Sequence, residues 1–320
     1  MDSTKTQKLA QSEAKDRQDV SINSNGENGH AEKKSGRLDV LKTYKIYIDG
    51  KFPRTESGRY YILKSEDGNQ LGNICKSSRK DFREAVVAAR KAQPGWAGKS
   101  AYNKGQILYR IAEVLEGRRA QFIEELIQQG ADKSQATEEV NLSIDRLVHY
   151  AGWSDKYIQI FSSVNPVESS HFNFSVPEPT GVVSMIAAED TGLIGLVSII
   201  APAIVGGNTV VVLASESKPL CAISFAEVLQ TSDVPSGVIN ILTGEAKELH
   251  THFSSHMDVN AIVYCQGNEE QSKTIQTNAA LNVKRVHDYR KCDWMSAARQ
   301  GPYFIMDLQE IKTTWHPIGQ

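Results

Sequence analysis

The stretch "GVVSMIAAEDTGLIGLVSIIAPAIVGGNTVVVLASES", residues 181–217, decides the fold of this 320-residue chain. It begins and ends with short apolar runs of strand type, and an apolar segment of helical length lies between them. Two strands separated by a helix are typical of a parallel pair with a crossover connection. Because "VINILTG" (238–244) and "NAIVYCQ" (260–266) continue the alternation, we expect an α/β fold with a doubly wound, mostly parallel sheet buried on both faces.

Upstream of the sheet, residues 79–158 are expected to form a layer of helices. In "RKDFREAVVAARKAQ" (79–93) apolar residues recur at helical spacing, and Pro94 with Gly95 is expected to end this helix. Further helices are expected at three places, namely around 107–115, over 120–130 and over 134–158.

The chain before these helices divides into two parts. Residues 1–42 are polar and nearly free of aromatic side chains, so we expect them to be disordered. In "YKIYIDGKFPR" (44–54), Asp49-Gly50 is a strong hairpin-turn signal, and short strands are expected at 60–65 and 71–78.

Composition limits the kinds of partner. The chain has 36 Lys and Arg against 38 Asp and Glu, interspersed along its length, so we expect no nucleic-acid partner. The apolar segment 191–206 contains Pro202 and is shorter than the ~20 residues that cross a bilayer, so no membrane association is expected. The polar N-terminus lacks the apolar core of a signal peptide, and we predict a cytoplasmic location.

Metal ligands are not indicated. The four cysteines are widely spaced without a CxxC pair, which favours reduced thiols. His252 and His256 share a helical face near His250, but neither a carboxylate nor a cysteine is placed with them. We therefore interpret this segment as a surface helix and expect no metal site.

Five blocks of the chain, in order, resemble the cofactor-binding half of the aldehyde dehydrogenase superfamily, and the resemblance covers residues 44–280. The blocks are "EAVVAARKAQPGWAGKSAYNKGQILYRIAEVLEGRRAQFIEEL" (84–126), "HYAGWSDKY" (149–157), "EPTGVVSMI" (178–186), "APAIVGGNTVVVLASESKPL" (201–220) and "VPSGVINILTGEAKELHTHFSSHMDVNAIVY" (234–264). Members of the superfamily then carry a catalytic domain with a Glu in an "LELGG" context and a nucleophilic Cys in a "GQxC" context, and neither motif occurs here.

Instead, "MDLQEIKTTWHPIG" (306–319) resembles the family's final strand, through which sheets extend across subunits. The catalytic domain is therefore expected to be absent. The arrangement is similar to the C-terminal half of the double-headed aldehyde dehydrogenase family 16.

The resemblance implies that the catalytic parts are lost. Asp190 stands where the family's "PWNFP" loop has its oxyanion-donating Asn, and losing one such donor costs ~10²–10³-fold in rate. We expect no catalytic residue and interpret Glu189 and Asp190 as capping residues of the following helix. Cys292 lies beside Arg290 and Lys291, which would lower its thiol pKa. Its context differs from the nucleophile loop, so we expect a structural or surface thiol, with a nucleophile as the alternative.

The cofactor motifs are also altered. Where the family has "KPAE" to hold the adenosine ribose, Leu213 replaces the lysine while Glu216 is retained. In the family's "TGSxxxG" turn, Gln266 and Gln271 occupy the glycine positions beside Gly267. We expect that no cofactor is bound. The alternative is NAD(P) binding that depends on Glu216 and Gly267.

These inferences lead to one hypothesis and one rival. We expect a non-catalytic aldehyde dehydrogenase-like module that forms a homodimer or docks onto another aldehyde dehydrogenase-type domain. The rival is an NAD(P)-dependent oxidoreductase that works through a partner domain or is a fragment of a longer enzyme. The expected domains are a tail (1–42), a cofactor-type domain (43–285) with a strand extension (165–179), and a linker with an oligomerisation strand (286–320). The expected interface residues of the oligomerisation strand are Leu308, Ile311 and Trp315.

Overall fold

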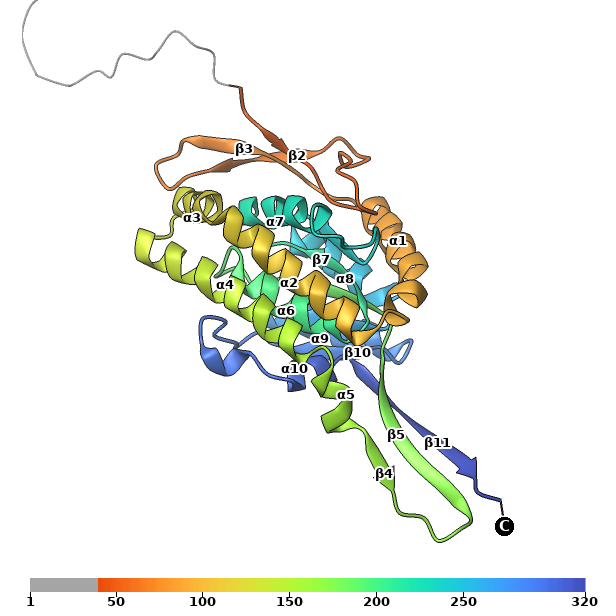
Figure 1. The fold of residues 1–320 in the computed structure, drawn as a ribbon. Helices are drawn as coiled ribbons and strands as arrows, with labels where there is room; N and C mark the ends of the chain where they lie inside the picture. Colours follow the sequence, from red (N-terminus) through yellow and green to blue (C-terminus); the bar gives the residue numbers. More distant parts are fainter. Residues whose placement is uncertain (1–39, 320) are drawn as a thin grey trace, which may run out of the picture. The chain divides into compact units, whose positions relative to one another are not determined.

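The computed structural model describes residues 40–319. A five-stranded parallel sheet lies at the centre of this part of the chain. The strand order is β10-β9-β6-β7-β8, and every neighbouring pair is parallel. Figure 1 shows the fold, with β7 and β10 of this sheet labelled. The strands are β6 (Val182–Ile186), β7 (Thr209–Leu213), β8 (Ile239–Leu242), β9 (Ala261–Tyr264) and β10 (Arg285–Asp288). The prediction of a doubly wound sheet is confirmed, and β10 is a fifth strand that was not anticipated.

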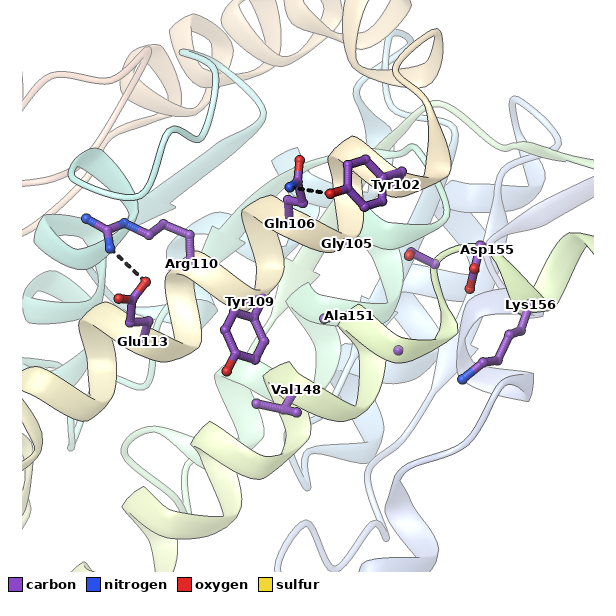
Figure 2. Close-up of a pocket in the computed structure, with 12 residues that line it drawn as sticks. Tyr102, Gly105, Gln106, Tyr109, Arg110, Glu113, Val148, Ala151, Asp155 and Lys156 are labelled. Carbon is purple, nitrogen blue, oxygen red and sulfur yellow. Dashed lines mark hydrogen bonds and ion pairs between the residues drawn. The ribbon is translucent and has the colours of Figure 1, made fainter.

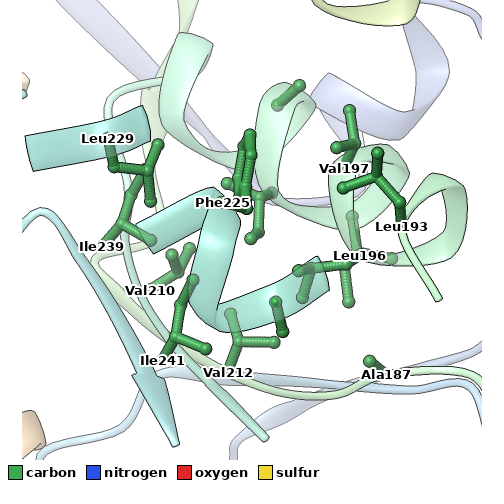
Figure 3. Packing of buried hydrophobic residues seen from close by; sticks show 14 of the residues in the cluster. Ala187, Leu193, Leu196, Val197, Val210, Val212, Phe225, Leu229, Ile239 and Ile241 are labelled. Atoms are coloured by element: carbon green, nitrogen blue, oxygen red, sulfur yellow. The ribbon is translucent and has the colours of Figure 1, made fainter. Parts of the chain in front are cut away.

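Alternate side chains of each strand build two separate cores, one on each face of the sheet. In β6, Val183 and Met185 belong to one core while Val182 and Ile186 belong to the other. The pleat of a strand requires this division, because successive side chains point to opposite faces. Figure 3 shows the first core, where Val210 and Val212 of β7 pack beneath α6 and α7.

Helices cover both faces. On the first face lie α6 (Ile194–Val205) and α7 (Leu220–Gln230), followed by a second layer of α2 (Ala101–Gly117), α3 (Arg119–Gln128) and α4 (Lys133–Trp153). On the other face lie α1 (Arg79–Ala97), α8 (Ala246–Ser255) and α9 (Glu269–Ala280). The expected helical layer is therefore divided, because α1 packs across the sheet from α2, α3 and α4.

Two predicted helix ends were wrong. The first helix does not stop at Pro94 but includes it, because Trp96 is buried and its indole nitrogen donates to the carbonyl of Ile204 at 2.9 Å. The packing of Trp96 stabilises the last helical turn, in which Pro94 removes only one backbone hydrogen-bond donor. The expected helix over 134–158 is broken after Trp153, and α5 (Lys156–Phe161) follows as a separate short helix.

Two small sheets flank this body. One contains β1 (Thr43–Tyr44), β2 (Tyr60–Lys64) and β3 (Gln70–Cys75). The predicted hairpin turn at Asp49-Gly50 is present, with positive φ of 52° and 72°. It lets Tyr47 exchange two 2.8 Å backbone hydrogen bonds with Ile241, which closes the β8 edge.

The other small sheet, here called the arm, contains β4 (Ser163–Asn165), β5 (His171–Pro179) and β11 (Gln309–Pro317). All three strands are antiparallel, and β5 falls within the predicted extension. A 3-10 turn (Ala297–Arg299) and α10 (Tyr303–Met306) precede β11. Of the expected disordered tail, residues 1–39 lie outside the described residues. No helix over 40–319 is both long and apolar enough to span a bilayer.

Candidate functional site

The candidate site lies where the parallel strands of the sheet have their carboxyl ends, here called the carboxyl edge. Strand order reverses between β6 and β9, and ligands of doubly wound sheets bind at such a switch point. Three loops meet there, namely those that follow β6, β7 and β9 at residues 187–193, 214–219 and 265–268. They are the loops in which the sequence places Asp190, Glu216 and Gly267.

Glu189 connects these three loops. Its Oε2 accepts hydrogen bonds from the hydroxyls of Ser215 (2.8 Å) and Ser217 (2.9 Å) and from the Ser217 amide (3.2 Å). Its Oε1 accepts from the Glu216 amide (3.0 Å) and from Nε2 of Gln266 (2.8 Å). One carboxylate of the chain therefore uses the donors that an oxyanion or hydroxyl ligand at this edge would need.

The two residues on which cofactor binding was expected to depend remain at the surface. Glu216 is exposed, and its carboxylate has no hydrogen bond or ion pair within residues 40–319, although its carbonyl accepts from the hydroxyl of Tyr61 at 2.9 Å. Burial, and then the carboxylates of Glu245 and Glu189, raise the pKa of Glu216. Gly267 is also exposed, and a Cβ added there would meet nothing within 4 Å.

The three altered cofactor positions each have an internal role. Leu213 is fully buried in the core on the α1 and α8 face. Gln266 is 9% exposed and donates to Glu189, while Oε1 of Gln271 accepts from the hydroxyl of Tyr264 at 2.9 Å. These side chains are held by contacts within the chain.

The expected capping role of Glu189 and Asp190 was wrong. The amides of Gly192, Leu193 and Ile194 all donate to Oε1 of Glu139, at 2.9, 2.7 and 3.1 Å. Glu139 is buried and lies on α4, so a carboxylate distant in sequence caps α6 and complements its dipole. No helical spacing relates Glu139 to α6, so the sequence carried no signal for this cap. Asp190 is exposed, and its carbonyl accepts a hydrogen bond from Nζ of Lys218 at 2.7 Å, while its carboxylate has no hydrogen bond to any residue of 40–319.

The segment between β10 and β11 covers the first turn of α6. Trp294 is buried, and a Cβ added to Gly195 would come within 3.3 Å of its indole ring. Arg146 of α4 holds the segment by donating to the carbonyl of Trp294 at 2.9 Å. Burial raises the pKa of Cys292, and Arg290 forms an ion pair with Asp288 at 2.8 Å instead of activating the thiol. This geometry does not favour a nucleophilic thiolate.

The three predicted interface residues separate into two groups. Leu308 is 3% exposed and packs in the core, so its placement on a free interface was wrong. Ile311 and Trp315 are 53% and 57% exposed on one face of β11. Within residues 40–319, β5 is the only strand paired with β11, which leaves the other edge of β11 open.

A large hollow lies away from the sheet edge. It has a volume of about 630 Å³ and runs between α2 and α4, where Figure 2 shows Tyr102, Tyr109 and Val148 beside the Arg110–Glu113 ion pair. No group of His, Cys, Asp or Glu side chains suited to a metal ion occurs among residues 40–319. The carboxyl edge thus remains the candidate on geometric grounds.

Comparison with known proteins identifies one family. Residues 53–288 match the aldehyde dehydrogenase family. Retinal dehydrogenase 2 of Gallus gallus is 34% identical over 254 residues, which cover 77% of this chain and 48% of the relative. Cytosolic 10-formyltetrahydrofolate dehydrogenase of Xenopus tropicalis is 30% identical over 292 residues, with 85% of this chain and 32% of the relative covered.

Solved structures agree at the level of the fold. The NAD+ complex of an aldehyde dehydrogenase from Bacillus cereus superposes with a TM-score of 0.73 at 23% identity, over 77% of this chain and 50% of that protein. PnpE in complex with nicotinamide adenine dinucleotide gives 0.73 at 26% identity, over 76% and 50%. The chain spans about half the length of these proteins, or less.

Proposed function

Because the chain belongs to the aldehyde dehydrogenase family, we propose that it is a non-catalytic module that associates with a second copy or with another aldehyde dehydrogenase-type domain. One observation carries the proposal, namely that Glu189 fills the carboxyl edge with five hydrogen bonds. An anionic cofactor at this edge would have to displace a carboxylate whose donors are already satisfied.

The chemistry of the surrounding residues supports the same function. Asp190 supplies no oxyanion donor, and Cys292 is a thiol whose pKa is raised. The family match ends at Asp288, and the described residues that follow fold over α6 and then enter the arm. Within the family, this order supports a relationship to the C-terminal half of family 16. The free cysteines of residues 40–319 support a cytoplasmic location.

The arm is the proposed surface of association. An exposed strand with an unpaired edge can add to the sheet of a partner, and Ile311 and Trp315 would give the added strand an apolar face. We expect the wild-type protein to be a dimer by light scattering. Ile311→Lys and Trp315→Lys should shift it toward monomer, while Tyr60→Ser, which removes an exposed aromatic from β2, should not. A wild-type monomer unaffected by either lysine would contradict the association.

Calorimetric titration with NAD tests the non-catalytic part. The wild type should give no saturable heat, and Glu189→Ala, which frees the serine hydroxyls and amides, should bind measurably. The matched variant Asp190→Ala removes an exposed carboxylate without freeing those donors and should remain silent. Micromolar binding by the wild type that is lost on Glu216→Ala would overturn the proposal.

A second function is favoured by a different observation. The carboxylate of Glu216 and the backbone at Gly267 are accessible, and structures of similar fold are NAD+ complexes. The chain would then bind NAD(P) as part of an oxidoreductase whose catalytic residues come from a partner domain or a longer protein. The same titration separates the two functions.

A further inference from the structure

A hollow of about 360 Å³ lies between α1 and α8 on the face of the sheet opposite α6 and α7. We call it the α1–α8 hollow. Its polar lining consists of Arg79, Arg83, His252, Ser255 and His256. It contains two of the three histidines that the sequence singled out, now beside two arginines from another helix.

Aromatic packing fixes the position of this hollow. The rings of Phe82 and Phe253 stack with centroids 4.1 Å apart, and the ring of His256 meets Phe82 edge-on at 5.7 Å. Arg79 and Arg83 are one turn apart on α1, and His252 and His256 are one turn apart at the end of α8. Spacing of four residues places each pair on one helix face, so the two pairs face the same space.

The arginine charges in the hollow are not compensated. By contrast, Lys80, the residue that follows Arg79 on α1, pairs with Glu56 at 3.1 Å. Within residues 40–319, neither Arg79 nor Arg83 forms an ion pair or a side-chain hydrogen bond. Like charges at this spacing destabilise a helix, so an anion between them would be favourable.

Two further cations contact the chain just after α8, and their partners are neutral. Arg90 donates to Oδ1 of Asn260 at 2.6 Å and to the carbonyl of Asp258. Nζ of Lys284 donates to the carbonyl of His256 at 2.8 Å. The Asp258 carboxylate also acts on His256, but it forms no ion pair within the described chain. Three cations, Arg79, Arg83 and Lys284, therefore act on His256 against the single carboxylate of Asp258.

The histidines add neutral donors. Nδ1 of His256 accepts from the Asp258 amide at 3.2 Å, so the ring proton of the neutral form is on Nε2. Burial lowers the pKa of both histidines, and the surrounding cations lower it further. For His252 those cations are Arg79 and His250, and for His256 they are Lys284, Arg83 and Arg79, with Asp258 opposing them.

We propose that the α1–α8 hollow binds an oxyanion of the phosphate class, with Arg79, Arg83 and Nε2 of His256 as donors. Guanidinium groups match phosphate oxygens in pairs, and this hollow has room for more than the ion itself. The ligand is a free phosphate or a small phosphate monoester. The site does not depend on the function of the carboxyl edge.

Histidine ring-proton NMR of the full chain, titrated with inorganic phosphate, tests the site. A bound anion favours imidazolium, so phosphate should raise the pKa of His252 and His256 by about one unit. The ring-proton signals of His171, which lies in the arm, should not move on addition of phosphate. Arg83→Gln should weaken phosphate affinity about tenfold or more, because it removes a charge-assisted hydrogen bond. Both arginines are exposed, so these variants should fold.

Controls separate binding from screening. Arg54→Gln makes the same charge change at another exposed position and should leave phosphate affinity unchanged. Sodium chloride at matched ionic strength screens the arginine charges without occupying the site, so it should shift both histidines much less than phosphate does. Equal shifts with chloride, or full phosphate affinity in the Arg79→Gln, Arg83→Gln double variant, would overturn the site. Adenosine monophosphate binding more tightly than phosphate would identify a monoester, and weaker binding would identify the free ion.

Discussion

The carboxyl edge of the sheet and the α1–α8 hollow differ in whether their charged side chains have partners within the chain. At the edge, Glu189 and Glu139 accept all their hydrogen bonds from donors of the same chain. In the hollow, Arg79 and Arg83 have no partner among the described residues. The difference teaches that, where the fold predicts a ligand, donors of three loops already have an acceptor within the chain. The two unpaired arginines lie between α1 and α8.

The largest effect is expected at Glu139. Glu139→Ala leaves three buried amides of α6 without an acceptor and should lower the free energy of unfolding by about 3–4 kcal/mol. Glu139→Gln keeps one acceptor oxygen and should lose less. Urea denaturation followed by circular dichroism measures both, with exposed Glu138→Ala as the matched control. If Glu139→Ala and Glu138→Ala were equally stable, Glu139 would not be needed as the cap of α6, and the comparison between the edge and the hollow would fail.

Lys284 tests the cost of the uncompensated charge beside the hollow. Burial lowers its pKa from 10.5 to about 8, so folding disfavours the protonated lysine. This penalty is complete below pH 8 and is relieved as the pH rises from about 8 to 10.5. Lys284→Met should therefore be more stable than wild type at pH 7, by at most about 3 kcal/mol.

The difference between the two proteins should shrink across that pH window. Urea midpoints measured from pH 7 to 10.5 provide the test, and Lys291→Met, which alters an exposed lysine, provides the control. A constant difference at every pH would show that the amine charge is not responsible.

Glu189 should have a smaller effect on stability. Its donors at residues 216 and 217 are exposed and can turn to water, so Glu189→Ala should cost about 1–2 kcal/mol. Thermal unfolding would measure this loss, with Asp190→Ala expected to be neutral. If Glu189→Ala also left the stability unchanged, the hydrogen bonds of the Glu189 carboxylate would not stabilise the carboxyl edge.

Arg83→Gln gives the smallest expected change in stability, and this change is a gain where those of Glu139→Ala and Glu189→Ala are losses. Removing one of two like charges a helical turn apart should stabilise the phosphate-free protein by about 0.2–0.5 kcal/mol. Added phosphate should raise the melting temperature of wild type more than that of the variant. A variant less stable than wild type without phosphate would mean that Arg83 has a favourable partner within the protein.

Much of the sheet could be predicted because its strands are buried on both faces. Strands β6 and β7 are continuous apolar runs for that reason, and the pattern is legible in one sequence. Strand β10, "RVHD", lies at the sheet edge with its side chains partly exposed, so no apolar run marked it. The end of α1 was misplaced because the burial of Trp96 outweighs the local effect of Pro94.

The candidate site was harder to predict than the sheet. The altered positions Leu213 and Gln266 were found because a family motif gave them a place. The contacts that replace the motif join Glu189 to Gln266, 77 residues away, and Glu139 to Leu193, 54 residues away. Such pairings are decided by the tertiary fold, and neither periodicity nor capping rules contain them.

The five hydrogen bonds of Glu189 also bear on how the protein persists in a cell. A protein that binds a small molecule gains stability as the free concentration of that molecule rises, and loses it when the supply falls. The carboxylate of Glu189 is part of the chain, so its contribution to stability does not depend on the supply of any ligand. Under the proposed non-catalytic function, the stability of the protein should therefore be the same whether the nicotinamide nucleotide pool is full or depleted.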